Sequence, residues 1–331
     1  MNGPARATED GLIARYFAPL AGIGADRLRD DAATLTPTPG HDLVLTADAV
    51  VAGVHHFPDD PPASIARKAL GVNLSDLAAK GATPRGFLLT LALPDDWSED
   101  WLADFADGLG RAALEADCPL LGGDTVRAGG PLLIGVTAFG EVPAGAMIRR
   151  TSAAIGDRLC VTGTVGDAAL GLLLRLEPDA PWAGALDPAM RDHLEDRYLH
   201  PRARLALARG LRRQASAAMD ISDGFAGDLA KMLGDGRSAR IDADAVPLSP
   251  AAARALSVEP GLIQRLLTGG DDYEILCAVR PESLDALRAE AAEVGVPLAV
   301  VGTVVAGDVP PVFEMGEGEP RVFTAGAFSH F

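Results

Sequence analysis

Apolar residues recur at two different spacings along the chain, and the two spacings predict different elements. An apolar residue at every third or fourth position is typical of a helix with one buried face, and short apolar runs are typical of strands. In the first half, the helical spacing predicts helices over residues 9–21, 62–84 and 99–117. Apolar runs predict strands over residues 41–53, 86–93, 119–124 and 131–142.

Residues 142–157 combine weak periodicity with several small residues, so we expect the domain junction there. A chain of 331 residues favours two domains, and we expect them to comprise residues 1–147 and 148–331. The second half begins with a strand, a glycine turn and a helix over residues 158–176 and continues with strands at 238–244, 273–279 and 297–305. Because strands alternate with helices in both halves, the predicted fold class is α/β, or α+β, in two domains.

The composition of the chain bears on its compartment, its membrane partners and the state of its cysteines. Hydrophobic residues make up 48% of the chain, yet no stretch is long and apolar enough to span a bilayer, so we expect no membrane partner. The first residues lack an apolar signal core, and we expect a cytoplasmic protein. The three cysteines, Cys118, Cys160 and Cys277, lie far apart among apolar residues, which indicates reduced core thiols.

The net charge of −17, without any run of Lys or Arg, argues against binding to nucleic acid. The same negative field repels ATP and phosphorylated metabolites unless cations intervene. The chain contains no GxxxxGK[ST] P-loop and no protein-kinase motif set. Polyphosphate would therefore have to be bound by a different kind of site.

Acidic residues that follow apolar runs or precede helices suggest such a site, and "MDISDG" is the clearest example. Asp220 follows an apolar run, and Ser222 and Asp223 precede a predicted helix. In one interpretation Ser222 caps that helix and Asp223 complements its dipole, which leaves Asp220 without a role. In the other, the two carboxylates hold Mg²⁺ and Ser222 donates to a phosphate oxygen at the helix N-terminus.

A second group of acids lies in the first half of the chain. Asp48 closes an apolar run, with Thr46 two residues earlier on the same strand face. In the helix over residues 62–84, Ala66, Leu70, Leu74 and Leu77 form an apolar stripe. Asn73 lies within that stripe, with Asp76 three residues later on the same side. A strand-end turn at Asp48 and an internal network of Asn73, Asp76 and Lys80 are the purely structural alternatives.

Three further signals complete the set. In "GGDT" two glycines precede Asp124, which either lets the backbone approach a ligand closely or forms a hairpin turn. "RDDA" carries Asp30 and Asp31 in a loop, and "GGDDYE" places Asp271 before a strand. Hard oxygen ligands of this kind suit several Mg²⁺ ions that bridge carboxylates and substrate phosphates. Zinc is disfavoured because histidines are few and the cysteines are scattered.

Read in order, the motifs "RDDAA", "LTADAVVAGVHHF", "KALGVNLSDLAAKGATP", "LLGGDT", "MDISDG" and "GGDDYE" resemble the thiamine-monophosphate kinase family. Its superfamily includes aminoimidazole ribonucleotide synthetase and selenophosphate synthetase. The resemblance implies ATP-dependent phosphorylation of thiamine monophosphate to thiamine diphosphate with release of ADP. It also implies a homodimer whose N-terminal mixed sheets, with their helices, pair into a shared β-barrel. The C-terminal α/β domain would close over an interdomain cleft.

The resemblance also implies roles for individual residues. Asp30, Thr46, Asp48, Asp76, Asp124, Asp220 and Asp223 would bind several Mg²⁺ ions. Gly123, Asp124, Arg150 and Ser222 would contact ATP, and His55, Asp271 and Phe328 would border thiamine monophosphate. Asp220, Asp223 and Arg150 would form the catalytic set.

Three positions depart from the family pattern: Arg29 replaces the usual Gly, Ala47 a frequent hydroxyl residue, and Asp271 the usual Glu. None of the three removes a carboxylate from the metal set. Two alternatives remain at this point. One is another ATP-using enzyme of the superfamily, and the other is a non-catalytic sensor of Mg-nucleotide.

Overall fold

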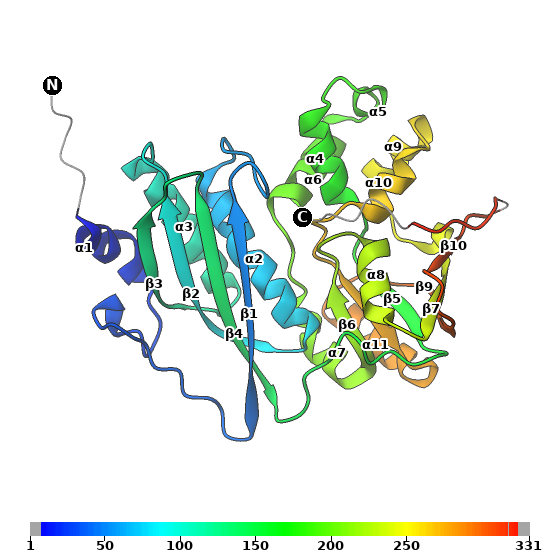
Figure 1. Ribbon diagram of the computed structural model, residues 1–331, viewed down its shortest axis with the longest axis horizontal. Helices are drawn as coiled ribbons and strands as arrows, with labels where there is room; N and C mark the ends of the chain where they lie inside the picture. The colour runs from blue at the N-terminus through cyan, green and yellow to red at the C-terminus, as the bar shows by residue number, and fades with distance from the viewer. Residues whose placement is uncertain (1–7, 317, 324–331) are drawn as a thin grey trace. The chain divides into compact units, whose positions relative to one another are not determined.

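The computed structural model describes residues 8–316 and 318–323 and divides into two compact units (Figure 1). Unit 1 contains the described residues up to Leu77 together with Thr83–Gly145. Unit 2 contains Ala78–Ala82 and the described residues from Ala146 onwards. In the part of the chain that is described, no helix is both long and apolar enough to cross a membrane.

Unit 1 is a four-stranded mixed sheet with helices. Its strands, in spatial order, are β1 (His41–Val51), β4 (Leu133–Pro143), β2 (Thr83–Leu93) and β3 (Leu120–Arg127). Its helices are α1 (Glu9–Leu12), the short η1 (Ile13–Phe17), η2 (Ala18–Leu20) and η3 (Asp26–Leu28), then α2 (Pro62–Ala79) and α3 (Glu99–Glu115). β4 is antiparallel to both β1 and β2, whereas β2 and β3 are parallel and joined through α3. The four predicted strands and the helix at α3 are confirmed. α2 ends at Ala79, before the predicted end at residue 84, and the predicted helix over residues 9–21 is a succession of the short helices α1, η1 and η2.

The two faces of this sheet differ in their side chains. α2 and α3 cover one face, behind the sheet in Figure 1. Side chains that alternate toward that face, such as Leu89 and Val136, are buried. The intervening positions carry partly exposed apolar residues, among them Leu45 at 60% exposure and Leu88 at 37%. Strand pairing therefore presents one covered and one open face, as the period of two requires.

Unit 2 contains a six-stranded sheet that is antiparallel except at one edge. In spatial order the strands are β10 (Val312–Glu314), β7 (Arg237–Asp242), β9 (Leu298–Ala306), β5 (Arg158–Thr162), β8 (Ile275–Val279) and β6 (Ala215–Asp220). The helices are α4 (Asp167–Leu176), α5 (Pro181–Gly184), α6 (Pro188–Leu199), α7 (Ala208–Gln214), α8 (Phe225–Leu233), α9 (Pro250–Val258), α10 (Leu262–Thr268) and α11 (Leu284–Glu293). Short 3₁₀ turns are η4 (Leu205–Leu207), η5 (Ala243–Ala245) and η6 (Pro281–Ser283). Among the described strands of this sheet, β10 and β7 are the pair that is parallel.

Alternation along the central strands of unit 2 builds two cores. Leu159 and Val161 of β5 pack in one cluster with α8, while Cys160 between them packs in another with α7 and α11. A third cluster joins α4, α5, α6, α9 and α10. Every cysteine is buried and free, which confirms the interpretation of reduced core thiols.

Two expectations about strand ends are wrong. Asp48 lies inside β1 and Asp124 lies inside β3, so neither residue occupies the end of a strand or a hairpin turn. The apolar run that precedes each residue stops at the aspartate, but the hydrogen-bonded ladder of each strand continues past it.

Candidate active site

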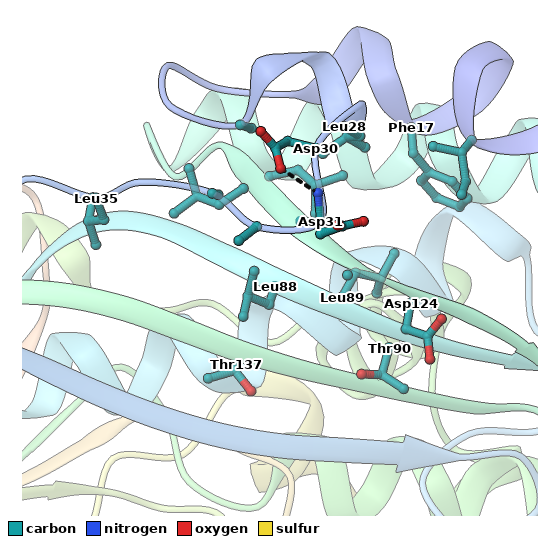
Figure 2. Close-up of a pocket in the computed structure, with 18 of the residues that line it drawn as sticks. Phe17, Leu28, Asp30, Asp31, Leu35, Leu88, Leu89, Thr90, Asp124 and Thr137 are labelled. Carbon is teal, nitrogen blue, oxygen red and sulfur yellow. Dashed lines mark hydrogen bonds between the residues drawn. The ribbon is translucent and has the colours of Figure 1, made fainter. Parts of the chain in front are cut away.

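A cavity of about 850 Å³ in unit 1 brings two of the predicted ligand residues together. Asp30 and Asp31, from the segment before β1, line it with Asp124 of β3 (Figure 2). The backbone N–H of Asp31 donates to Asp30 Oδ1 at 2.7 Å, which fixes the loop locally. Thr90 and Thr137, on the open sheet face, add hydroxyl groups to the lining. The cavity thus offers the oxygen donors that a cation bound to phosphate requires.

The glycines of "GGDT" allow close pairing between neighbouring strands of the sheet. A Cβ at Gly123 would lie 2.0 Å from the carbonyl oxygen of Leu89 in β2, so only glycine allows β3 to pair there. The close approach that the sequence suggested is therefore made to a neighbouring strand. Asp124 follows directly, with its side chain exposed on the open face of the sheet.

Four polar residues of β1 and α2 meet on the other side of the sheet. Thr46 Oγ1 donates to Asp76 Oδ2, and the backbone N–H of Asp48 donates to Asn73 Oδ1 at 3.0 Å. The fully buried Asn73 therefore links the apolar stripe of α2 to β1. In the strand register Asp48 shares a face with Gly123, so Asp124 lies on the opposite face. Unit 1 thus carries two separate acidic groups.

In unit 2 the motifs "MDISDG" and "GGDDYE" lie side by side. The backbone N–H of Asp271 donates to the carbonyl oxygen of Ser222, and that of Tyr273 donates to Ile221, each at 2.9 Å. A Cβ at Gly270 would lie 2.2 Å from the Ser222 carbonyl oxygen. Asp271 and Tyr273 also adopt positive φ angles of 74° and 50°, which non-glycine residues rarely do. Positive φ angles outside glycine cluster at functional sites, and here they accompany the substrate residue that the sequence predicted.

Asp228, which the sequence analysis missed, anchors the "DISD" loop. Its Oδ2 accepts the backbone N–H groups of Ser222 at 3.0 Å and Asp223 at 2.9 Å. Lys231 donates to Asp228 Oδ1 at 2.9 Å and also to Asp223. Burial raises the pKa of Asp228. The spacing of Asp228 and Lys231 on one helix face was the available signal.

The start of α8 excludes one of the two interpretations of Ser222. The helix begins at Phe225 with Gly224 as N-cap, and the N–H groups of Ser222 and Asp223 are already bonded to Asp228. The capping interpretation of Ser222 is therefore wrong. Gly224 has a φ of 117°, and a Cβ there would lie 2.4 Å from the Thr268 carbonyl oxygen, so this turn requires glycine.

The other two acids of "GGDDYE", Asp272 and Glu274, are buried and stabilise the loop that carries Asp271. Asp272 is fully buried and accepts the N–H groups of Gly166 at 2.6 Å and Ala168 at 3.2 Å, at the start of α4. Desolvation raises the pKa of Asp272 to about 8. Buried Glu274 pairs with Arg197 at 2.9 Å and with Arg204. These contacts fix the backbone directly after Asp271.

The remaining predicted residues are placed as follows. His55 lies in the turn after β1, and its Nδ1 accepts the N–H of Val51 at 3.1 Å. Arg150 is exposed in the segment that precedes β5, and Asp220 is the buried last residue of β6. Phe328 lies outside the described residues.

The donor set of the predicted metal residues consists of carboxylate and hydroxyl oxygens, which fits Mg²⁺ and disfavours zinc. Within residues 8–316 and 318–323, no three or more His, Cys, Asp or Glu side chains are grouped so that they could hold a metal ion by themselves. Magnesium is commonly bound through one or two carboxylates plus substrate phosphates and waters. Asp30 and Asp124 in unit 1, and Asp220 and Asp223 in unit 2, each form a pair of carboxylates that agrees with this mode of binding.

Comparison with known proteins adds to this geometry. Family models of the AIR synthase related protein match the chain over residues 29–142 for the N-terminal domain and 154–313 for the C-terminal domain. Thiamine-monophosphate kinase of Caulobacter vibrioides is 41% identical over 91% of this chain and 85% of its own length. That of Escherichia coli K12 is 38% identical over 98% of both chains. The chain belongs to the thiamine-monophosphate kinase family.

Solved structures agree with this membership of the thiamine-monophosphate kinase family. The kinase from Stenotrophomonas maltophilia K279a matches with a TM-score of 0.78 and 39% identity, over 87% of this chain and 90% of that chain. AaThiL complexed with AMPPCP and TMP matches with a TM-score of 0.73 and 28% identity, over 88% and 90%. The hydrogenase maturation protein HypE in complex with ATP shares the fold, with a TM-score of 0.79 at 20% identity.

Proposed function

We propose that the chain transfers the γ-phosphoryl group of ATP to the phosphate of thiamine monophosphate, which yields thiamine diphosphate and ADP. One observation carries the proposal: thiamine-monophosphate kinases are 38–41% identical to this chain over most of its length. AaThiL, of the same family, was solved with AMPPCP, an analogue of ATP, and TMP. ATP is accordingly the co-substrate.

The acceptor explains why no strong general base is needed. A phosphate monoester is already ionised near neutral pH, so the main obstacle is repulsion between two anions. Arg150 would place a fixed positive charge against the phosphates. The neighbouring loops would present Ser222 as a hydrogen-bond donor to ATP and Asp271 to the cationic thiamine ring, near Tyr273.

Several Mg²⁺ ions belong to the proposal. When bound, Mg²⁺ neutralises the charge on the phosphates and holds donor and acceptor in line. Asp30 and Asp124, in one cavity, and Thr46 with Asp76 would bind it from unit 1. Asp220 and Asp223 would bind it from unit 2. In this proposal Asp48 belongs with Thr46 and Asp76, and Gly123 contributes to the ATP contact.

The decisive assay mixes the purified protein with Mg-ATP and thiamine monophosphate and separates thiamine diphosphate and ADP chromatographically. Equal amounts of both products would support the proposal, and turnover only with other acceptors would contradict it. A single-turnover experiment with excess enzyme distinguishes the kinase from a Mg-nucleotide sensor, because a sensor would bind ATP and transfer nothing. The shared-barrel homodimer and the cytoplasmic location stay predictions.

A further inference from the structure

Arg150 belongs to a segment that unit 2 holds closely on its C-terminal side. The Arg150 side chain is exposed and forms no hydrogen bond or ion pair with another residue that the structure describes. Three residues later, Ala153 is buried, with 3% exposure, in the cluster that includes the apolar residues of α8. The N–H of the next residue, Ala154, donates to Asp157 Oδ2 at 2.9 Å. These contacts fix the backbone that follows Arg150.

Arg237, the half-buried first residue of β7, holds this segment most directly. Its Nη1 donates to the carbonyl oxygen of Thr151 at 3.0 Å and to that of Ala153 at 2.6 Å. Because Nη1 of a guanidinium carries two hydrogens, both bonds form at once. The two acceptors belong to the residues one and three positions after Arg150. We call these two bonds the Arg237 clamp.

The partners of Arg237 differ from those of the other arginine of β7. Acidic residues outnumber basic ones by 46 to 29 in this chain, and Arg240 pairs with one of them, Glu314, at 3.4 Å. Among residues 8–316 and 318–323, in contrast, no carboxylate forms an ion pair with Arg237. No acid competes there for the Nη1 hydrogens, so the guanidinium is committed to the backbone beside Arg150.

Ser152, between the two clamped carbonyl groups, ties the same segment to a different strand. Its Oγ lies 2.9 Å from the carbonyl oxygen of Arg149 and 2.7 Å from that of Ser216 in β6, and its one hydrogen donates to either of them. In the sheet, β7 and β6 are separated by β9, β5 and β8. The backbone around Arg150 is therefore attached to two strands that are not neighbours, while the Arg150 side chain stays exposed.

We propose that Arg237 is a positioning residue for Arg150: the Arg237 clamp sets the direction from which the Arg150 guanidinium meets the phosphates of ATP. In the proposed function, on which this inference rests, Arg150 contacts ATP. A displacement of about 1 Å in a group that binds substrate can lower the rate roughly a hundredfold, so a residue that only holds the backbone beside Arg150 affects turnover. Arg237 itself contacts no phosphate in this proposal, and its removal should have no effect once Arg150 is gone.

The test is a double-mutant cycle of Arg150→Gln and Arg237→Gln, with kcat and KM measured for Mg-ATP and for thiamine monophosphate. We expect Arg237→Gln to lower kcat/KM for Mg-ATP at least tenfold and to change KM for thiamine monophosphate less than twofold. The double variant should stay within twofold of Arg150→Gln alone, because the clamp acts only through Arg150. Arg237→Lys, which keeps a charged donor, should recover part of the loss. The matched control is Arg240→Gln, at an exposed position of the same strand, and it should change no parameter more than twofold.

Losses in kcat/KM that multiply in the double variant would overturn the proposal, since they would show that Arg237 acts independently of Arg150. An unchanged kcat/KM in folded Arg237→Gln protein would overturn it as well. If Arg237→Gln does not fold, Arg237→Lys replaces it in the cycle under the same criteria.

The same cycle in the Kd of Mg-AMPPCP, measured by calorimetry, separates failure of the clamp from failure of the proposed kinase activity. Unaltered protein that binds Mg-AMPPCP but forms no thiamine diphosphate would refute the kinase activity. Losses of affinity that multiply in the double variant would refute the clamp, whether or not the unaltered protein turns over.

Discussion

Replacing Asp228 by Ala tests whether a single buried carboxylate holds the "DISD" loop. Asp228 is fully buried and accepts two backbone N–H groups, from Ser222 and Asp223. The substitution removes both bonds and leaves two N–H donors at the start of α8 without their acceptor. It also removes one of the two carboxylates that Lys231 contacts.

The size of the effect follows from these contacts. A hydrogen bond to a charged group contributes about 1.5–3 kcal/mol, so two such bonds contribute roughly 3–6 kcal/mol. The pair with Lys231 adds at most about 1 kcal/mol, because the lysine side chain is 42% exposed. Removing a carboxylate whose burial is itself costly, as its raised pKa shows, returns part of this energy. We expect a net destabilisation of unit 2 by about 2–4 kcal/mol.

The assay is calorimetric unfolding of the purified protein, followed by steady-state kinetics with Mg-ATP and thiamine monophosphate. For a unit of this size, about 2–4 kcal/mol lowers Tm by roughly 4–15 °C. Because the loop carries Ser222 and Asp223, we also expect kcat/KM to fall at least about tenfold. Asp235→Ala, at an exposed position just beyond α8, removes the same charge and serves as control.

A Tm for Asp228→Ala within 1 °C of that of the Asp235→Ala control would refute this reasoning. It would show that water or a shifted side chain replaces the carboxylate without measurable loss. Reduced stability with unchanged kcat/KM would show that Asp228 supports the fold but does not position the loop.

Three further variants test other parts of the site. Gly270→Ala forces a Cβ against the Ser222 carbonyl oxygen and should lower both Tm and kcat/KM, whereas Gly261→Ala, in open space, should change neither by more than the measurement error. Desolvation raises the pKa of Asp272 to about 8. Between about pH 4 and pH 8 the native carboxyl therefore keeps a proton that the unfolded chain has lost, and stability falls as pH rises. Asp272→Asn should abolish this slope in Tm measured from pH 5 to pH 9; a persistent slope would contradict the assignment. Asn73→Ala should destabilise unit 1 by about 1–3 kcal/mol in urea unfolding, since it removes the buried side chain whose Oδ1 accepts the N–H of Asp48 in β1; no change would contradict its bridging role.

Most elements were predictable because they depend on local periodicity. The apolar stripe of α2 and the alternating or continuous apolar runs of the strands are visible in the sequence, and the structure confirms them. The ends of elements were less predictable. Asp48 and Asp124 interrupt apolar runs, yet both continue their strands, because ladder hydrogen bonds and pairing partners come from residues distant in sequence.

The supporting residues of the site could not be read from the sequence for the same reason. Asp272 and Glu274 belong to the same motif as Asp271, but their partners Gly166, Arg197 and Arg204 are at least 70 residues away in the chain. A motif shows which residue types occur together. Only the fold shows which of these residues face a ligand and which are buried and stabilise the loop backbone.

The central proposal is that aspartates of unit 1 and aspartates of unit 2 bind divalent ions at the phosphates. The most direct measurement is a crystal structure with AMPPCP, thiamine monophosphate and Mn²⁺ in place of Mg²⁺, with the ions located by anomalous scattering. The account predicts manganese peaks at Asp124 in unit 1 and at Asp220 and Asp223 in unit 2, with phosphate oxygens completing their coordination. Peaks ligated from one unit alone, or phosphates bound without any ion near Asp124, Asp220 and Asp223, would contradict it.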